Sequence, residues 1–160
     1  MGYTTKFDGS ISIVPPLNAH EISYLKRFAG SRHVDGEDGP YVTRDTDDPG
    51  FSQPPPEQPG LYCDWEPSDD GTVLRWNGSE NSYDSPEWVR YLIGTFLRPD
   101  AALLAELVTS NLVPDRYYAP EFAHFTFDHV LDGVVNAQGE EVGDLWQLSV
   151  IANDVTERRR

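Results

Sequence analysis

Between residues 5 and 13 the chain alternates between an apolar face, with Phe7, Ile11 and Ile13, and a polar face. A period of two with one polar face is typical of a half-buried β-strand. We expect this strand to end at Pro15 and Pro16, because proline has no amide hydrogen to donate to a neighbouring strand.

A helix is predicted directly after these prolines. Asn18 is followed three residues later by Glu21, which is the spacing of a capping box at a helix N-terminus. Leu25 and Phe28 then lie on one apolar face with helical spacing, and Gly30 is a typical residue for the end of a helix. The sequence therefore predicts a helix from about residue 19 to residue 30.

Two short alternating segments around Trp65 and Trp76 flank a turn rich in Pro, Asp and Gly at 67–71. This pattern predicts a β-hairpin. Cys63 has the same parity as Trp65, so we expect it to be a small buried apolar residue and not an activated thiolate.

The second half of the chain predicts helices followed by strands. Ser85 before Pro86 is one helix-capping register, and Asp84 with Glu87 is the other. The helix that follows has an apolar stripe formed by Val89, Leu92, Ile93 and Phe96. Trp88 lies on the same stripe, one helical turn before Leu92. We also expect a helix at 101–112 and strands at 126–138 and 146–152. A further short strand is expected in the first half of the chain, at 41–43.

This order of elements predicts an α+β fold, with an antiparallel-rich sheet and helices on one face. The specific expectation is a ferredoxin-like split βαβ arrangement with additional elements. We expect a single domain over 1–157, a long Pro/Gly/Asp-rich loop at 31–58, and a frayed basic tail at 158–160. A loop of that length is either functional or mobile.

The net charge of the chain limits the kinds of molecule that the protein is expected to bind. The chain has 160 residues with 27 acidic and 12 basic side chains, which gives a net charge of −15. Such a surface repels nucleic-acid phosphates and anionic lipids, so we expect a basic or cationic protein partner, with no direct nucleic-acid or membrane binding. The absence of an apolar leader and the single cysteine favour a cytoplasmic protein. The oligomeric state is left open.

Several blocks of the chain resemble a family of small bacterial and phage proteins whose hairpin reads close to QPGLWCQW. The blocks are QPGLYCDW, DGTVLRWNGSE, EWVRYLI and LDGVVNAQGEEVGDLW. Tyr62 and Asp64 stand where that family has Trp and Gln. The resemblance implies a bacterial or phage origin, and it implies no catalytic residue.

The strongest catalytic candidates are His124 and Thr126. On a strand they would share a face, as in the H-x-T motif of two-histidine phosphoesterases. That chemistry needs a second copy to supply both an acid and a base, and the sequence has none. No metal-binding or nucleotide-binding motif is present, so we expect neither a metal nor a cofactor.

Two other groups are candidates for binding a ligand or a partner. The first is the acidic part of the long loop, with Asp45, Asp47 and Asp48. The second is aromatic and combines features of a core and of a ligand pocket; its members are Trp65, Trp76, Tyr83 and Trp88.

Three functional hypotheses follow. The preferred one is a small acidic, non-enzymatic binding module for a basic or cationic partner, such as an accessory or inhibitor protein of a phage or mobile element. The second is a small hydrolase or phosphoesterase-like enzyme. The third is a DNA mimic, in which Asp and Glu imitate phosphates.

Overall fold

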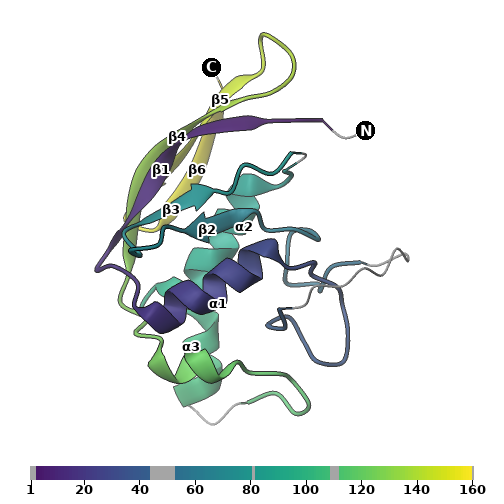
Figure 1. Ribbon diagram of the computed structural model, residues 1–160, viewed down its shortest axis with the longest axis vertical. Helices are drawn as coiled ribbons and strands as arrows, with labels where there is room; N and C mark the ends of the chain where they lie inside the picture. The colour runs from purple at the N-terminus through teal and green to yellow at the C-terminus, as the bar shows by residue number, and fades with distance from the viewer. Residues whose placement is uncertain (1–2, 44–52, 81, 109–111, 160) are drawn as a thin grey trace.

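The computed structural model describes residues 3–43, 53–80, 82–108 and 112–159. Figure 1 shows a curved sheet with the helices gathered on one side of it. All neighbouring strands in this sheet are antiparallel, in the order β2-β3-β1-β4-β5-β6. The strands are β1 (Lys6–Val14), β2 (Trp65–Pro67), β3 (Val73–Trp76), β4 (Val130–Gln138), β5 (Leu145–Ile151) and β6 (Asp154–Arg159). The predicted α+β class and antiparallel sheet are confirmed.

The helical elements lie between β1 and β2 and between β3 and β4 in the sequence. They are α1 (Ala19–Gly30), α2 (Ser85–Leu92) with a π-helical continuation (Ile93–Leu97), α3 (Ala102–Val108) and a 3₁₀ helix (Pro120–His124). None of the helices in the described ranges has the length and apolar character needed to cross a membrane.

The core lies between one face of the sheet and the helices. Along each long strand buried side chains alternate with exposed ones, as expected for an antiparallel sheet with one wet face. The buried sheet residues Ile11, Ile13, Leu131, Val135, Leu148 and Val150 share one apolar cluster with Leu25 and Phe28 of α1 and with Trp88, Val89 and Leu92 of α2.

The prediction of the helix N-terminus is confirmed for α1 but not for α2. Asn18 and Glu21 form the predicted capping box, with hydrogen bonds in both directions. At α2, Ser85 is the first helical residue and not the cap, so that register is wrong. Asp84 occupies the cap position with φ 58°, but its side chain makes no capping hydrogen bond.

Other boundaries also differ from the sequence-based expectation. The predicted strand at 126–138 begins only at Val130, and residues 41–43 do not form a strand. The strand β6 was missed, and Arg158 and Arg159 belong to it instead of to a frayed tail, because they pair with Gln147 and Trp146. Of the predicted helix at 101–112, the structure describes α3 over Ala102–Val108; residues 109–111 lie outside the described ranges, and Leu112 is not helical.

The described parts of the 31–58 loop are held against the domain. His33 and Tyr41 are buried, and the backbone amide of His33 donates to the carbonyl of Leu61. The buried Gln58 side chain donates to the carbonyl of Pro40. The flanks of this loop therefore belong to the folded domain.

The central strands β1 and β4 approach each other closely at Gly133, which lies opposite Ile11. A Cβ at this position would lie 2.6 Å from the carbonyl oxygen of Ser10 and 2.8 Å from Cα of Ile11. Both obstacles are backbone atoms, so the strand pair would have to separate to admit a side chain.

We therefore expect Gly133→Ala to lower the free energy of unfolding by about 1–3 kcal/mol, as for other overpacked sites. Urea denaturation monitored by tryptophan fluorescence measures this. Gly143→Ala is the matched control, because a Cβ there meets no atom within 4 Å. Equal stability of the two variants would contradict the close approach of β1 and β4.

Candidate functional site

One hollow of the structure combines carboxylates with aromatic rings, and we call it the acidic pocket. It lies between the segment that precedes β2 and the N-terminal end of α2, with a volume of about 640 Å³. This size suits a small organic ligand or one end of a peptide. The lining residues are Gly60, Leu61, Tyr62, Asp64, Ser79, Glu80, Tyr83, Asp84 and Trp88.

Asp64 is the buried carboxylate of the acidic pocket, with 7% of its surface exposed. Its backbone adopts the left-handed conformation, with φ 63°. Its Oδ2 accepts a hydrogen bond of 3.1 Å from Ser82 Oγ. Burial raises the pKa of Asp64, while hydrogen bonds from Ser82, Asn77 and Ser79 act in the opposite direction. Neutral donors alone thus hold this carboxylate.

Asp84 is the second left-handed aspartate of the pocket, with φ 58°. Left-handed backbone is costly for most residues, although Asp and Asn tolerate it best. Partial burial and then the neighbouring charge of Glu87 raise the pKa of Asp84. Among the described residues, no basic side chain forms an ion pair with Asp64 or Asp84. In the described part of the chain, the charge of these two aspartates is therefore not balanced by an ion pair.

Trp88 lies in the wall of the same pocket. The side chain is fully buried, and its indole Nε1 has no hydrogen-bond partner among the described residues. A Cβ placed on Gly60 would lie 3.7 Å from this nitrogen and 3.7 Å from Oδ2 of Asp84. A side chain at position 60 would therefore contact both Trp88 and Asp84.

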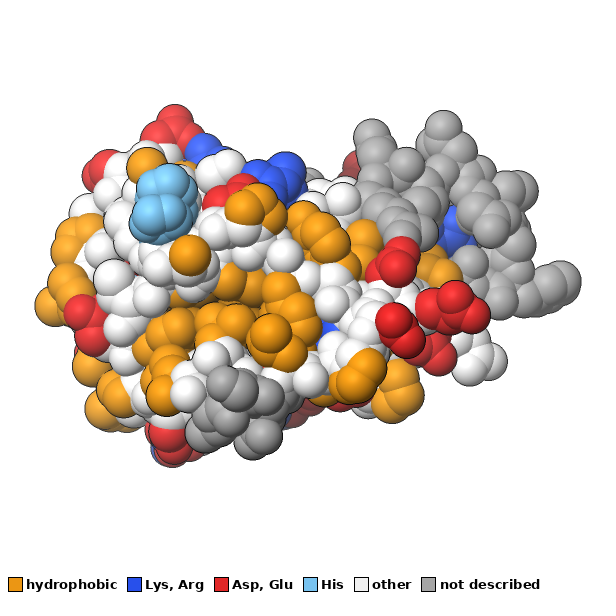
Figure 2. All heavy atoms as spheres, turned by 90° about the horizontal axis from the view of Figure 1, so that it is seen from below, with side chains coloured by type: hydrophobic (Ala, Val, Ile, Leu, Met, Phe, Trp, Pro, Cys, Tyr) orange, Lys and Arg blue, Asp and Glu red, His pale blue; other side chains and the backbone are white. Residues whose placement is uncertain are grey.

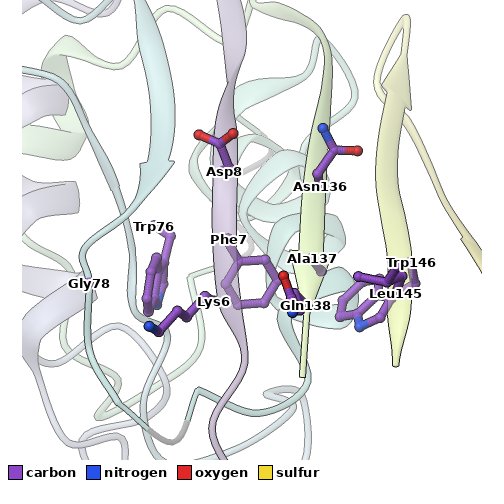
Figure 3. A pocket seen from close by; sticks show the side chains of 10 residues that line it. All are labelled: Lys6, Phe7, Asp8, Trp76, Gly78, Asn136, Ala137, Gln138, Leu145 and Trp146. Atoms are coloured by element: carbon purple, nitrogen blue, oxygen red, sulfur yellow. The ribbon is translucent and has the colours of Figure 1, made fainter. Parts of the chain in front are cut away.

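A second hollow, which we call the aromatic hollow, lies across the end of the sheet and has a volume of about 570 Å³. Figure 3 shows Phe7 between Trp76 on one side and Trp146 on the other. The ring of Phe7 meets both indoles edge to face, at centroid distances of 5.4 Å and 5.7 Å. Ala137 pairs with Phe7 on one side and with Trp146 on the other, so the rings of Phe7 and Trp146 meet across this small residue.

A hydrogen-bond chain connects the two hollows. The indole nitrogen of Trp76 donates to Ser82 Oγ over 3.0 Å, and Ser82 Oγ donates to Asp64 Oδ2. The orientation of the Trp76 ring is thus tied to the carboxylate of the acidic pocket.

The aromatic group anticipated from the sequence is divided by the fold. Tyr83 and Trp88 line the acidic pocket, and Trp76 lines the aromatic hollow. Trp65 lies in the core, with 1% of its surface exposed. Asp45, Asp47 and Asp48 lie outside the described residues. Asp64 and Asp84 were not predicted from the sequence as pocket residues. The one feature that could have indicated them is that each is an aspartate outside the helices and strands.

His124 and Thr126 are not on a strand. His124 ends the 3₁₀ helix and stacks on His20 with ring centroids 3.8 Å apart. Figure 2, in which the molecule is seen from below, shows histidine side chains in pale blue gathered in one surface patch. Thr126 Oγ1 donates to Asp128 and lies 3.1 Å from Nε2 of His129. The fold therefore associates Thr126 with His129 and not with His124.

His129 and Glu21 form a buried pair that sequence reasoning missed, with exposures of 1% and 0%. Nε2 of His129 donates to the Glu21 carboxylate over 2.8 Å, and Nδ1 donates to the carbonyl of Pro15 over 2.7 Å. Burial alone would lower the pKa of His129, but these two hydrogen bonds raise it, with a net shift upward. A histidine that donates from both nitrogens has no lone pair with which to act as a base.

Metal binding and thiol chemistry each need a particular arrangement of side chains. In the described ranges, no group of three or more His, Cys, Asp and Glu side chains is arranged to hold a metal ion. Cys63 is buried, as predicted, and its thiol donates to the carbonyl of Trp65. Burial raises the pKa of this thiol, which disfavours the reactive thiolate.

The chain matches no protein-family model, no curated protein and no solved structure. Any functional inference therefore depends on the geometry of the acidic pocket and the aromatic hollow.

The His129–Glu21 pair predicts a pH dependence of stability. Because the folded-state pKa of His129 is raised, its stabilising contribution is complete below the ordinary histidine pKa of about 6.5 and is lost as the pH rises through the raised value. We expect urea denaturation between about pH 5.5 and pH 8.5 to show this loss in the wild type and its absence in His129→Gln. His20→Gln, at an exposed position, is the control. An unchanged pH profile in His129→Gln would refute the pairing.

Proposed function

We propose that the protein is a non-enzymatic binding module that receives a cationic group of a partner in the acidic pocket. The observation that carries the proposal is that Asp64 and Asp84 line one hollow and that no basic side chain in the described part of the chain forms an ion pair with either of them. A bound cation would supply the missing charge at the place where the carboxylates are partly desolvated.

The walls of the pocket suit a cation as well. Tyr62 and Tyr83 are about half exposed, and the faces of such rings attract ammonium and guanidinium groups. The net charge of −15 adds a long-range attraction for basic surfaces. Charge would thus bring a partner to the protein, and the pocket would select the group that enters.

The enzymatic alternative has less support. His124 and Thr126 point to different neighbours, and both nitrogens of His129 are occupied as donors. A DNA mimic would need acidic groups in a regular stripe, whereas the carboxylates of this site, from Asp64, Glu80 and Asp84, line one pocket. The proposal includes a bacterial or phage origin, because an accessory protein that binds a basic partner is consistent with the resemblance of the QPGLYCDW block to bacterial and phage proteins.

We also propose a ferredoxin-like core with additions for this fold. The order β4-β1-β3-β2, with helical segments between β1 and β2 and between β3 and β4, supports this assignment. On this view β5 and β6 extend the sheet beyond β4, and the acidic pocket lies beside β2 at the other end.

Titration with propylammonium and methylguanidinium, followed by NMR, tests the proposed function. We expect millimolar binding that shifts resonances of the acidic pocket and weakens from about 50 to 300 mM salt, as the Debye length shortens from roughly 14 to 6 Å. Asp64→Asn and Asp84→Asn should each weaken binding several-fold without changing the backbone, because Asn also tolerates left-handed φ.

Asp100→Asn is the matched control, because Asp100 is exposed and lies outside the pocket. Propionamide, which has a similar size but no charge, should not bind. Equal binding of propionamide and propylammonium, or full binding by the double Asp64→Asn, Asp84→Asn variant, would rule out the proposed function.

A further inference from the structure

We propose that His20 and His124 form a surface site for a divalent transition metal ion such as Zn²⁺, with one ring nitrogen of each histidine as a ligand and water at the other positions. The site is separate from the acidic pocket and does not depend on the proposed function. It is carried by two exposed imidazoles that the fold brings into contact from distant segments, which is why the sequence shows no motif for it.

The two rings touch at the surface of the molecule. His20 lies in the first turn of α1 and His124 ends the 3₁₀ helix, and their rings stack with centroids 3.8 Å apart and 14° between their planes. Both residues are exposed, in agreement with the histidine patch in Figure 2. Within the described ranges, the histidine ring nitrogens that form hydrogen bonds are those of His33 and His129. The ring nitrogens of the stacked pair are therefore open to a ligand from solvent.

Contacts of the backbone and of neighbouring side chains hold the pair together. Nδ2 of Asn18, the cap residue of α1, donates to the carbonyl oxygen of His124 over 2.8 Å. Farther along α1, Nη2 of Arg27 donates to Oε2 of Glu121 in the 3₁₀ helix over 2.5 Å. These two contacts fix α1 and the 3₁₀ helix to each other, so the two histidines stay adjacent even when their rings move.

Metal binding requires the two rings to turn, because stacked rings direct their lone pairs along nearly parallel planes. A metal at about 2.0–2.1 Å from each imidazole nitrogen holds the two nitrogens within about 4 Å of each other. The centroid distance of 3.8 Å already brings the rings to this separation. Exposed side chains change rotamer rapidly, so both rings can turn one lone pair towards a common point.

The other nitrogen and sulfur ligands of the chain are not available to a metal. All four histidines and the single cysteine lie in the described ranges. His33 is buried with Nε2 2.8 Å from the carbonyl oxygen of Phe28, His129 donates from both nitrogens, and Cys63 is buried. His20 and His124 are thus the accessible imidazoles of this protein.

The ligand set determines which ions fit. Imidazole suits zinc, nickel and copper, whereas magnesium and calcium prefer oxygen ligands. Among the described residues, no group of three His, Cys, Asp or Glu side chains is arranged around a metal, so two histidines are the protein ligands of this site. Catalytic and structural zinc centres use more protein ligands than this. We therefore expect reversible binding, with open positions on the metal.

Titration of the full chain with Zn²⁺, followed by NMR of the imidazole ring protons, tests the site. We expect the ring resonances of His20 and His124 to shift together, while those of His33 and His129 stay in place. Mg²⁺ at the same concentration should shift none of them, because a hard cation binds to carboxylates instead. The magnesium titration thus separates the histidine site from general attraction to an acidic surface.

Single substitutions locate the ligands. His20→Gln and His124→Gln should each weaken Zn²⁺ binding by about tenfold or more, since the remaining imidazole loses the second ligand that the fold holds close to it. Ala19→Gln is the matched control, because Ala19 is an exposed neighbour of His20 in α1 and brings no imidazole. Thermal unfolding without metal shows whether each variant is folded.

The outcomes decide the proposal in either direction. A joint shift of the two exposed histidines, lost in both single variants and kept in Ala19→Gln, supports the site. Unchanged Zn²⁺ affinity in the double variant His20→Gln, His124→Gln overturns it, as does the absence of any histidine shift at millimolar Zn²⁺. Equal shifts with Mg²⁺ and Zn²⁺ would also overturn it, because they would show that the imidazoles do not select the ion.

Discussion

The buried contact between Glu21 and His129 connects parts of the fold that are far apart in the sequence. One carboxylate oxygen of Glu21 accepts from the backbone amide of Asn18, which completes the start of α1, and the other accepts from His129 just before β4. The second ring nitrogen of His129 donates to Pro15, at the end of β1. The N-terminus of α1 is thereby fixed to the two central strands, and the direction in which α1 crosses the sheet follows from it. A buried ionic contact of this kind is costly to break from one side only.

Glu21 also shows how far the sequence alone leads. Its distance of three residues from Asn18 is enough to predict a capping box, because that motif is local. Its second role is not predictable, since the partner His129 lies 108 residues away and only the completed sheet brings it near. The same distinction explains the strands. The alternation in β1 and β5 is visible in the sequence, whereas β6, with its single buried residue Val155, has no apolar period to recognise.

The acidic pocket was unpredictable for a related reason. Its aromatic residues Tyr83 and Trp88 stand out by type, but an aromatic residue gives no indication of whether it lines a core or a pocket. Asp64 and Asp84 are two acids among many in an acidic chain, and they are distinguished only by backbone conformation and burial. Strained backbone tends to gather at sites that use it. In this chain two of the left-handed residues line one hollow.

The ends of the sheet have a consequence for the behaviour of the protein at high concentration. At one edge β2 has three residues and ends in Pro67, and at the other edge β6 carries Glu157, Arg158 and Arg159. The guanidinium of Arg90 also donates two hydrogen bonds to the carbonyl oxygen of Val155 in β6. A short edge with proline and an edge with charged side chains are poor templates for a strand from another molecule. The sheet is thus protected against growth by edge-to-edge pairing, the route by which exposed strands lead to aggregation.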